Sequence, residues 1–254
     1  MQFALLGSGS GGNALVLASA HTRVLIDGGF SCREMIRRLA ACGLSPRDLH
    51  AILLTHEHSD HSQGVLRLAR QANLPIFATW GTCHALGWLE TAPKAVTIEL
   101  IDCFSAWFVG EIHCQPFPVP HDAREPVQFV FSCSGRRLGV MTDVGHITPH
   151  MQRHLQGCHS LILECNHDPE ALARSAYPPN LKRRIAGAYG HLSNFAAAQL
   201  LATVQHPNLR QVVAAHMSEE NNHPQKVTEA LLPVLSALEQ LKFASDLQLQ
   251  WSEV

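Results

Sequence analysis

Short apolar runs dominate the chain and predict β-strands. Residues 2–6 alternate weakly, and the runs ALVLAS (14–19) and TRVLID (22–27) are separated by a short polar turn, which predicts a hairpin. Further buried strands are expected at HAILLT (50–55), LPIFAT (74–79), AWFVG (106–110), IHCQPFPV (112–119), VQFVFSC (127–133), RLGVMT (137–142), SLILEC (160–165) and QVVAAH (211–216).

Apolar positions at helical spacing predict a smaller number of helices. Ser31 and Glu34 open one helix as a capping box, and Gly43 ends it. Other helices are expected over 63–72, over 193–205 and over 225–242 after a proline at its first position, and the tail DLQLQW (246–251) alternates like an edge strand. The order of the predicted elements, with strands first and then strands alternating with helices, predicts an α/β fold. In this fold two sheets pack together and the helices lie outside them. Without repeats or a linker, residues 1–254 are expected to form a single domain.

Composition excludes several classes of protein. The 254 residues are 46% hydrophobic and 16% charged, as in an ordinary soluble globular protein, and the net charge of −2 means that a nucleic-acid partner would need a local basic patch. The start lacks a basic segment typical of a signal peptide, and no apolar run is long enough to span a membrane. The eight cysteines contain no C-x-x-C pair and are expected to be reduced thiols in a cytoplasmic protein.

A glycine-rich loop near the start raises a specific alternative. Gly7, Gly9 and Gly12 spell G-x-G-x-x-G, and Asp27 stands where a dinucleotide-binding fold places its ribose-binding acid. That loop must open a helix, because the helix N-terminus holds the pyrophosphate. A strand is predicted here instead, so nucleotide binding by this loop is disfavoured.

The stretch LLTHEHSDH carries the strongest chemical signal. His56 and His58 follow a buried strand and point to the same side of an extended segment, so both imidazoles can reach one metal ion. Asp60 and His61 lie a little further on, where the chain turns into a helix, and they can reach a second ion. The pattern differs from the zincin motif H-E-x-x-H, since Asp60 stands in place of the second histidine and no helix is expected at His56. The alternative is an exposed histidine-rich turn.

This box and several later residues resemble the metallo-β-lactamase superfamily, whose fold is a four-layer αββα sandwich. Besides the H-x-H-x-D-H box, its motifs match Asp27, His121 in PVPHDA, Asp143 in MTDVG and His216 in AAHMS. Each of these residues falls where a predicted strand ends and a loop begins. The strand would hold the side chain rigidly, and the loop region would leave it accessible to a ligand.

The resemblance implies two divalent metal ions, zinc or manganese. It implies one metal site of His56, His58 and His121, a second of Asp60, His61 and His216, and Asp143 as the bridge between them. Asp27 would then orient a ligand rather than bind metal itself. Such a pair of ions, about 3.5–4 Å apart, activates a bridging hydroxide for attack on phosphorus.

Finer motifs resemble the bacterial YycJ/WalJ (VicX-like) group within the superfamily. The matching stretches are GSGSGGNA, LIDGGFS, THEHSDH, PHDA, ECNHD, YPPNLKRRI, GHLSN and HMSEENN. This likeness implies a 5′ exonuclease that acts on DNA, favoured over RNA, with a role in DNA repair. His191, oriented by Glu164, would protonate the leaving oxygen, and Asp60 is counted with these two as a catalytic residue. For His191 the alternative is a place beside a helix cap at Ser193.

Two segments are expected to contact the substrate. Ser8, Ser10 and Asn13 in the glycine loop could donate hydrogen bonds to an anion, although a plain tight turn explains them equally well. Lys182 and Arg183, with the arginine that follows them, are expected to bind the phosphate backbone. A solvated helix face is the alternative for this basic run.

Other functions fit the same metal box. A small-molecule hydrolase acting on a cyclic phosphodiester, lactone or thioester would use the same metals, because one fold hosts many reactions. It would not need the LKRRI and GHLSN segments, which favour the nuclease. A metal-stabilised regulatory protein without turnover is the third alternative. The sequence leaves the oligomeric state open.

Overall fold

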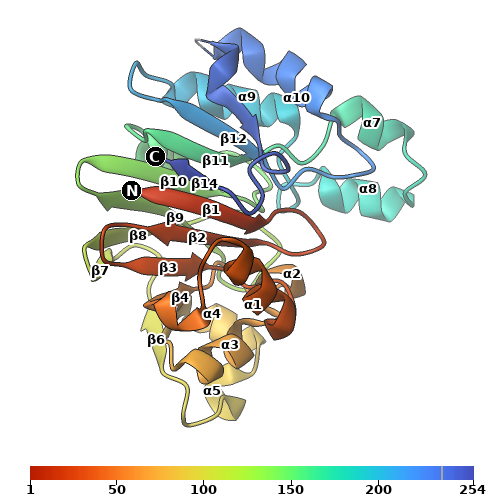
Figure 1. Ribbon diagram of the computed structural model, residues 1–254. Helices are drawn as coiled ribbons and strands as arrows, with labels where there is room; N and C mark the ends of the chain where they lie inside the picture. Colours follow the sequence, from red (N-terminus) through yellow and green to blue (C-terminus); the bar gives the residue numbers. More distant parts are fainter. Residues whose placement is uncertain (236) are drawn as a thin grey trace.

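Two seven-stranded sheets pack face to face, with helices against their outer surfaces (Figure 1). The computed structural model describes residues 1–235 and 237–254. The first sheet has the order β14-β1-β2-β3-β4-β5-β6. Its strands are β1 Gln2–Gly7, β2 Ala14–Ala18, β3 Arg23–Ile26, β4 Ala51–Leu53, β5 Ile76–Thr79, β6 Ile98–Ile101 and β14 Trp251–Glu253.

The second sheet has the order β13-β12-β11-β10-β9-β8-β7. Strands β10 to β13 pair in parallel, whereas β7 to β10 pair antiparallel. Its strands are β7 Trp107–Val109, β8 Ile112–Pro118, β9 Val127–Cys133, β10 Arg136–Met141, β11 Ser160–Glu164, β12 Gln211–Ala215 and β13 Leu241–Phe243.

The chain forms ten helices within the described residues. They are α1 Cys32–Ala41, α2 Ser59–Ser62, α3 Val65–Ala72, α4 Trp80–Ala85, α5 Trp88–Thr91, α6 Pro149–Leu155, α7 Pro169–Arg174, α8 Pro179–Ile185, α9 Asn194–Val204 and α10 Pro224–Leu231. Of these, α1, α3, α6, α9 and α10 cover the outer faces of the sheets. Short 3-10 turns lie at Pro46–Asp48, Leu232–Val234 and Leu238–Gln240. None of the described helices combines the length and the apolar character needed to cross a bilayer.

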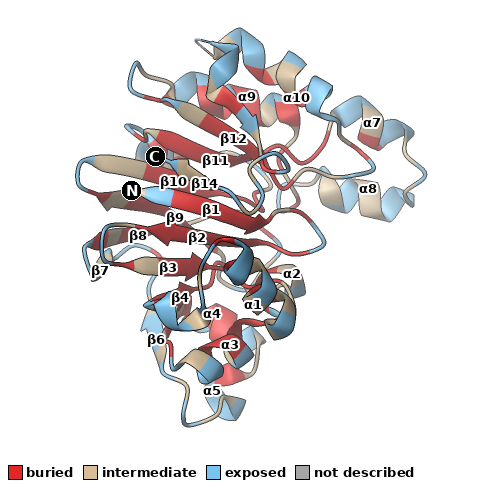
Figure 2. Ribbon diagram, viewed as in Figure 1, coloured by how far each residue is buried: buried red, intermediate tan, exposed pale blue. Residues whose placement is uncertain are grey.

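The central strands of both sheets are buried on both faces, because successive side chains point to opposite sides and both sides are covered (Figure 2). Leu5 packs in the layer between the sheets, while its neighbour Leu6 packs under the helices of the first sheet. In the second sheet, Ile162 faces the inner layer, and Leu161 and Leu163 face the outer helices. The strands therefore read as continuous apolar runs, as is typical of sheets covered on both sides.

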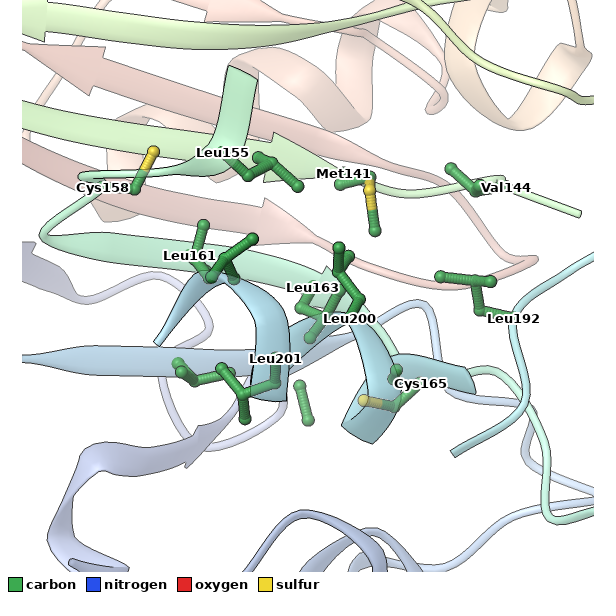
Figure 3. Packing of buried hydrophobic residues seen from close by; sticks show 14 of the residues in the cluster. Met141, Val144, Leu155, Cys158, Leu161, Leu163, Cys165, Leu192, Leu200 and Leu201 are labelled. Atoms are coloured by element: carbon green, nitrogen blue, oxygen red, sulfur yellow. The ribbon is translucent and has the colours of Figure 1, made fainter. Parts of the chain in front are cut away.

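The outer layer of the second sheet is a well-defined apolar core (Figure 3). Leu200 and Leu201 of α9 pack against Leu161 and Leu163 of β11, and Leu155 of α6 joins them. A matching cluster lies between the first sheet and helices α1 and α3. These two outer clusters and the inner one give the four-layer αββα arrangement expected from the sequence.

The glycine loop connects two strands, as predicted. Strands β2 and β3 form the expected antiparallel hairpin, with Leu17 opposite Val24. Because β2 and not a helix follows Gly12, the loop lacks the helix N-terminus that a dinucleotide pyrophosphate requires.

The C-terminal region differs from the helix expected over 225–242. Helix α10 begins at Pro224, the predicted first position, but ends at Leu231. Pro233 follows within a 3-10 turn, and its ring removes the amide needed to continue an α-helix. The chain later enters β13. The tail does form an edge strand beside β1, but at Trp251–Glu253 rather than over 246–251.

Candidate metal centre

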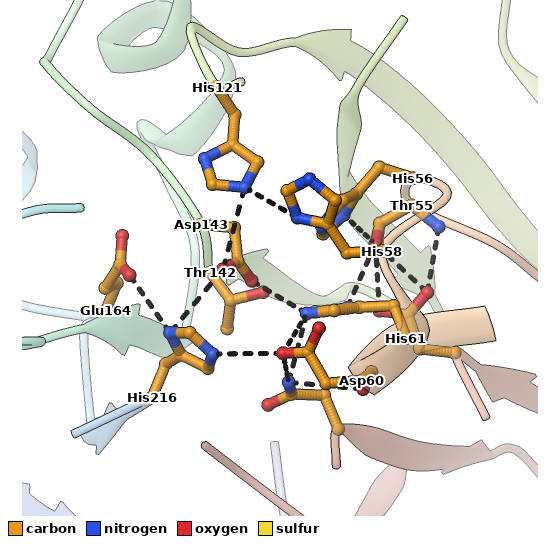
Figure 4. Close-up of polar contacts among 12 residues, drawn as sticks. Thr55, His56, His58, Asp60, His61, His121, Thr142, Asp143, Glu164 and His216 are labelled. Carbon is orange, nitrogen blue, oxygen red and sulfur yellow. Dashed lines mark hydrogen bonds and ion pairs between the residues drawn. The ribbon is translucent and has the colours of Figure 1, made fainter. Parts of the chain in front are cut away.

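Side chains from both sheets converge at the end of the sandwich where the strands stop (Figure 4). The stretch after β4 supplies His56 and His58, and the short helix α2 then carries Asp60 and His61. The chain thus turns into a helix at Asp60 and His61, as expected, although α2 is only four residues long. The second sheet supplies the remaining side chains after three of its strands: His121 after β8, Asp143 after β10 and His216 after β12.

Among the described residues, four overlapping groups of donor atoms lie close enough together to hold a metal ion, and two of them match the sets implied by the resemblance. His56, His58 and His121 make the first, with His121 Nε2 at 3.3 Å from His58 Nδ1. Asp60, His61 and His216 make the second, in which Asp60 Oδ2 lies 3.6 Å from His61 Nε2 and 3.8 Å from His216 Nε2. These are the two sets expected from the sequence.

Asp143 lies between the two groups. Its Oδ2 atom is 3.0 Å from His61 Nε2, and its Oδ1 atom is 3.9 Å from His121 Nε2 and 3.6 Å from His216 Nδ1. One carboxylate therefore reaches both sets of donors, which is the position expected of a bridging ligand.

Buried polar atoms without hydrogen bonds point to a bound cation. His56 Nε2, His216 Nε2 and Asp143 Oδ2 are all inaccessible to solvent and lack a hydrogen-bond partner, although Asp143 keeps its ion pair to His61. Leaving such a group unsatisfied costs about 1–3 kcal/mol, so native structures rarely collect several in one place. Nitrogen and carboxylate donors of this kind fit a divalent metal, and the residues present match the group that the fold implies.

The charges of the cluster favour a positively charged group among its side chains, such as a bound cation. Burial would raise the pKa of Asp143, but His216 and His61 hold it well below its usual value, so the carboxylate stays ionised. Burial lowers the pKa of His56 well below its usual value and keeps that imidazole neutral. Ionised carboxylate and neutral imidazole are the forms that bind metal. Burial would also lower the pKa of His216, yet Asp143 and other carboxylates raise it to about 10.

Asp27 holds one of the imidazoles in place. Its Oδ2 atom lies 2.8 Å from His61 Nδ1, while its Oδ1 atom accepts hydrogen bonds from the backbone N–H and the hydroxyl of Thr55. His61 Nε2 is thereby turned toward Asp143. The Thr55 hydroxyl also lies 3.0 Å from His56 Nδ1. Sequence reasoning missed Thr55, whose only signal was a polar residue at the end of a buried strand.

Replacing Asp27 by asparagine is expected to weaken metal binding by about 10- to 100-fold, because the ligand His61 loses its charged partner. The fold should persist, since Asp27 has a φ of 60° and asparagine tolerates this left-handed backbone. Competition with a metal indicator dye measures the affinity. Asp246→Asn removes an exposed carboxylate and serves as the control. Equal affinity in the two variants would show that Asp27 does not orient a ligand.

Glu164 and His191 form a buried pair beside the cluster. Glu164 is fully buried at the end of β11, and its Oε1 atom lies 2.7 Å from His191 Nδ1 and 3.1 Å from His216 Nδ1. Burial would raise the pKa of Glu164, but His191 lowers it to about 2; in turn Glu164 raises the pKa of His191 against the effect of burial. Glu164, His191, His216 and Asp143 also lie close enough together to hold a metal ion as a set.

Two of the three candidate side chains in the glycine loop make contacts within the protein. Asn13, expected to bind substrate, is buried; its side chain bonds with the backbone of Gly9 and with Asp60. Ser8 Oγ accepts the N–H of His216. Only Ser10 of the three candidates is exposed and lines the cavity over the metal cluster. The Asn13 amide holds the loop against α2, which fits the tight-turn alternative for this residue.

Close approach explains the glycines themselves. A Cβ atom on Gly12 would lie 2.6 Å from the Phe30 ring, and the φ of 142° at Gly12 is one that side chains rarely adopt. The loop therefore needs glycine for packing.

An open cavity of about 310 Å³ lies over the cluster, and helix α8 forms one of its walls. Leu181, Arg184 and Ile185 line it, since positions three and four apart share a helix face. Lys182 and Arg183, the expected phosphate contacts, do not line the cavity. The Lys182 ammonium instead donates to the carbonyl of Ala173 at 2.7 Å. Of the three basic residues expected to contact phosphate, Arg184 is the one that lines the cavity.

Comparison with known proteins agrees with this geometry. The profile of the Beta-lactamase superfamily domain matches residues 22–217. The chain is 34% identical to "Exodeoxyribonuclease YycJ" of Bacillus anthracis over 87% of this chain and 84% of the relative. It is 32% identical to "Exodeoxyribonuclease WalJ" of Streptococcus pneumoniae serotype 2 (strain D39), over 87% and 83% of the two chains.

A solved structure shows the same fold at lower sequence identity. The metallo-β-lactamase fold protein YhfI from Bacillus subtilis superposes with a TM-score of 0.74 and 15% identity, covering 95% of each chain. Its likeness concerns the arrangement of sheets and helices. The matched profile and the two close relatives carry the assignment further: the chain belongs to the metallo-β-lactamase superfamily and, within it, to the family of YycJ and WalJ.

Proposed function

We propose that the protein is a metal-dependent nuclease that removes nucleotides from the 5′ end of DNA. The observation that carries this proposal is that a cluster of metal-binding donors and an imidazole–carboxylate pair line one open, polar cavity. The two relatives that match most of the chain bear the name exodeoxyribonuclease, which supports DNA as the substrate. A cytoplasmic role in DNA repair fits this activity.

The residues present would hold two ions, zinc or manganese. His56, His58 and His121 would bind one, Asp60, His61 and His216 the other, and Asp143 both. When bound, such ions lower the pKa of a water molecule and stabilise negative charge on phosphate oxygens. Asp60 is partly exposed and lines the cavity, so it also faces the substrate.

His191 is placed to move a proton. Its Nδ1 atom faces Glu164 Oε1 at 2.7 Å, so Nε2 is the ring atom left to serve a substrate. The side chain lines the cavity and is 20% exposed, whereas Glu164 is fully buried. Since Glu164 raises the pKa of His191, the protonated imidazole is stabilised. We assign His191 as the acid that protonates the leaving oxygen, and Glu164 as the residue that positions it.

Glu164 itself is fixed by the backbone. Its Oε2 atom accepts the N–H groups of Val144 and Leu192 at 2.8 and 3.2 Å. The carboxylate can therefore hold its orientation while His191 gains and loses a proton.

Arg184 is the cation best placed to bind a substrate phosphate. Its Nε atom lies 2.6 Å from Asp122 Oδ2, and Asp122 Oδ1 lies 3.5 Å from His121 Nε2. Asp122 thus holds the guanidinium close to the metal cluster. The Arg184 side chain remains 61% exposed, which leaves its terminal nitrogens accessible for a bidentate phosphate contact.

Arg184→Ala is expected to raise the KM for DNA about tenfold and to reduce the slope of log KM against log salt by about one. Lys182→Ala and Arg183→Ala are matched controls on the same helix, and both should stay close to the wild type because they point away from the cavity. Steady-state cleavage of a labelled oligonucleotide at several salt concentrations measures both quantities. Equal effects of all three substitutions would indicate that the DNA runs along the outer face of α8.

The direct test uses one duplex labelled at either end. The protein is incubated with manganese or zinc and 5′-phosphorylated DNA, with the matching RNA, a lactone and a thioester in parallel. We expect release of mononucleotides from the 5′ end of the DNA. Internal fragments would indicate an endonuclease, cleavage of RNA alone would change the substrate, and hydrolysis of only the lactone or thioester would replace the proposal by a small-molecule hydrolase.

A further inference from the structure

A second cavity, of about 470 Å³, adjoins the first at the end of β12. His216, Met217 and Ser218 line both cavities, so the two share a wall. The rest of the lining comes from Ser8, from the start of α10 and from the segment 244–248. Nothing in the proposed reaction uses this space, although one of the metal-binding imidazoles borders it.

The walls of this second cavity are held by hydrogen bonds. Ser8 Oγ accepts the N–H of His216 at 2.8 Å, which ties the glycine loop to the shared wall. The N–H of Ala244 donates to the carbonyl of Ala214 at 2.9 Å and fixes the opposite wall on β12. The cavity therefore exists before a ligand arrives, and binding would require little ordering of the chain.

The lining favours a ligand with an apolar face and polar edges. Ala214, Ala215 and Ala244 are buried and give it an apolar floor, while Ser245 and Gln248 place exposed polar groups at the rim. No lysine or arginine is among the described residues that line it, and a glutamate, Glu219, does line it. The imidazoles of His216 and His223 also line it, and His216 belongs to the metal cluster, so the rest of the lining offers a phosphate little positive charge. The volume lies within the roughly 300–1,000 Å³ typical of small-ligand sites.

We propose that this cavity, the base pocket, receives the nucleobase of the nucleotide next to the scissile phosphate. The inference rests on the proposed nuclease function. Because His216 borders both the metal cluster and the base pocket, a base bound there would lie next to a phosphate at the cluster, as the base of an adjacent nucleotide does. Apolar side chains and the polarisable thioether of Met217 suit the face of a base, and rim amides and hydroxyls suit its edge.

A bulky side chain at the rim tests the base pocket. Ser245→Trp fills the mouth from an exposed position, and Asp246→Trp places the same bulk on the next residue, which is exposed and does not line the pocket. The substrates are 5′-phosphorylated DNA strands that each carry one abasic site at a different position. For the wild type, KM should rise on the order of tenfold when the abasic site stands at one particular position, and not at the others. Ser245→Trp should raise the KM for intact DNA by a similar factor, leave kcat unchanged, and abolish the sensitivity to that abasic site.

Two results would overturn the base pocket: identical kinetics for the two tryptophan variants, or equal sensitivity to abasic sites at every position. Absence of DNA cleavage by the wild type would instead overturn the nuclease function. In that case the pocket is tested without cleavage: calorimetry measures the binding of deoxyguanosine and of deoxyribose 5-phosphate. Heat of binding for deoxyguanosine in the wild type and Asp246→Trp, lost in Ser245→Trp, supports the pocket; binding of the sugar phosphate alone contradicts it.

Discussion

Replacing Asp143 by asparagine is expected to lower nuclease activity by about 10³-fold or more and to reduce the metal content of the purified protein. Asp143 is buried and is the carboxylate within reach of both donor groups, so an uncharged amide weakens both sites together. Loss of several kcal/mol of charge stabilisation corresponds to this factor in rate. Elemental analysis together with cleavage of labelled DNA provides the measurement, and the wild type should carry about two ions per chain.

Asp168→Asn is the matched control for this variant. Asp168 caps α7 by accepting the N–H of Ala171, and asparagine caps helices equally well, so both metal content and activity should persist. A fully active Asp143→Asn protein with unchanged metal would refute the bridging position and, with it, the proposed centre.

Replacing His191 by alanine is expected to reduce kcat by about 10²- to 10⁴-fold, the range usual for loss of a general acid. Metal content should be unchanged, because the ligand sets assigned here do not include His191. The comparison of kcat with KM is informative, since proton transfer occurs after binding and KM should change little. Single-turnover cleavage with metal analysis on the same sample provides both values.

His84→Ala, an exposed histidine on α4, controls for the loss of an imidazole as such. Because His191 lies within ligand distance of Glu164, Asp143 and His216, loss of metal in His191→Ala would make it a ligand. Unchanged kcat with unchanged metal would remove it from the mechanism altogether.

The local pattern of apolar and polar residues was enough to predict the strands that carry the site. Each candidate ligand lies at the end of a strand or in the turn that follows, where the change from apolar to polar residues is visible in the sequence. The helices missed at 80–85, 149–155, 169–174 and 179–185 are only six or seven residues long. Fewer than two turns give too few repeats for a helical period to be recognised.

The environment of single polar residues could not be predicted in the same way. Asn13 is buried because α2, 47 positions away, packs against its loop. Arg184 rather than Lys182 or Arg183 reaches the cavity because of the angle at which α8 docks, and a run of basic residues does not show which one faces inward. The roles assigned to His191 and Glu164 remain predictions until the variants are measured.

The division of the donors between the two sheets has a consequence for how the protein becomes active during synthesis. The β4 stretch supplies its four donors early in translation, whereas His216 emerges only when most of the chain has left the ribosome. A nascent or truncated chain that lacks β12 cannot assemble the full centre. The complete donor set therefore forms only after the chain up to His216 has been made and the second sheet has packed against the first.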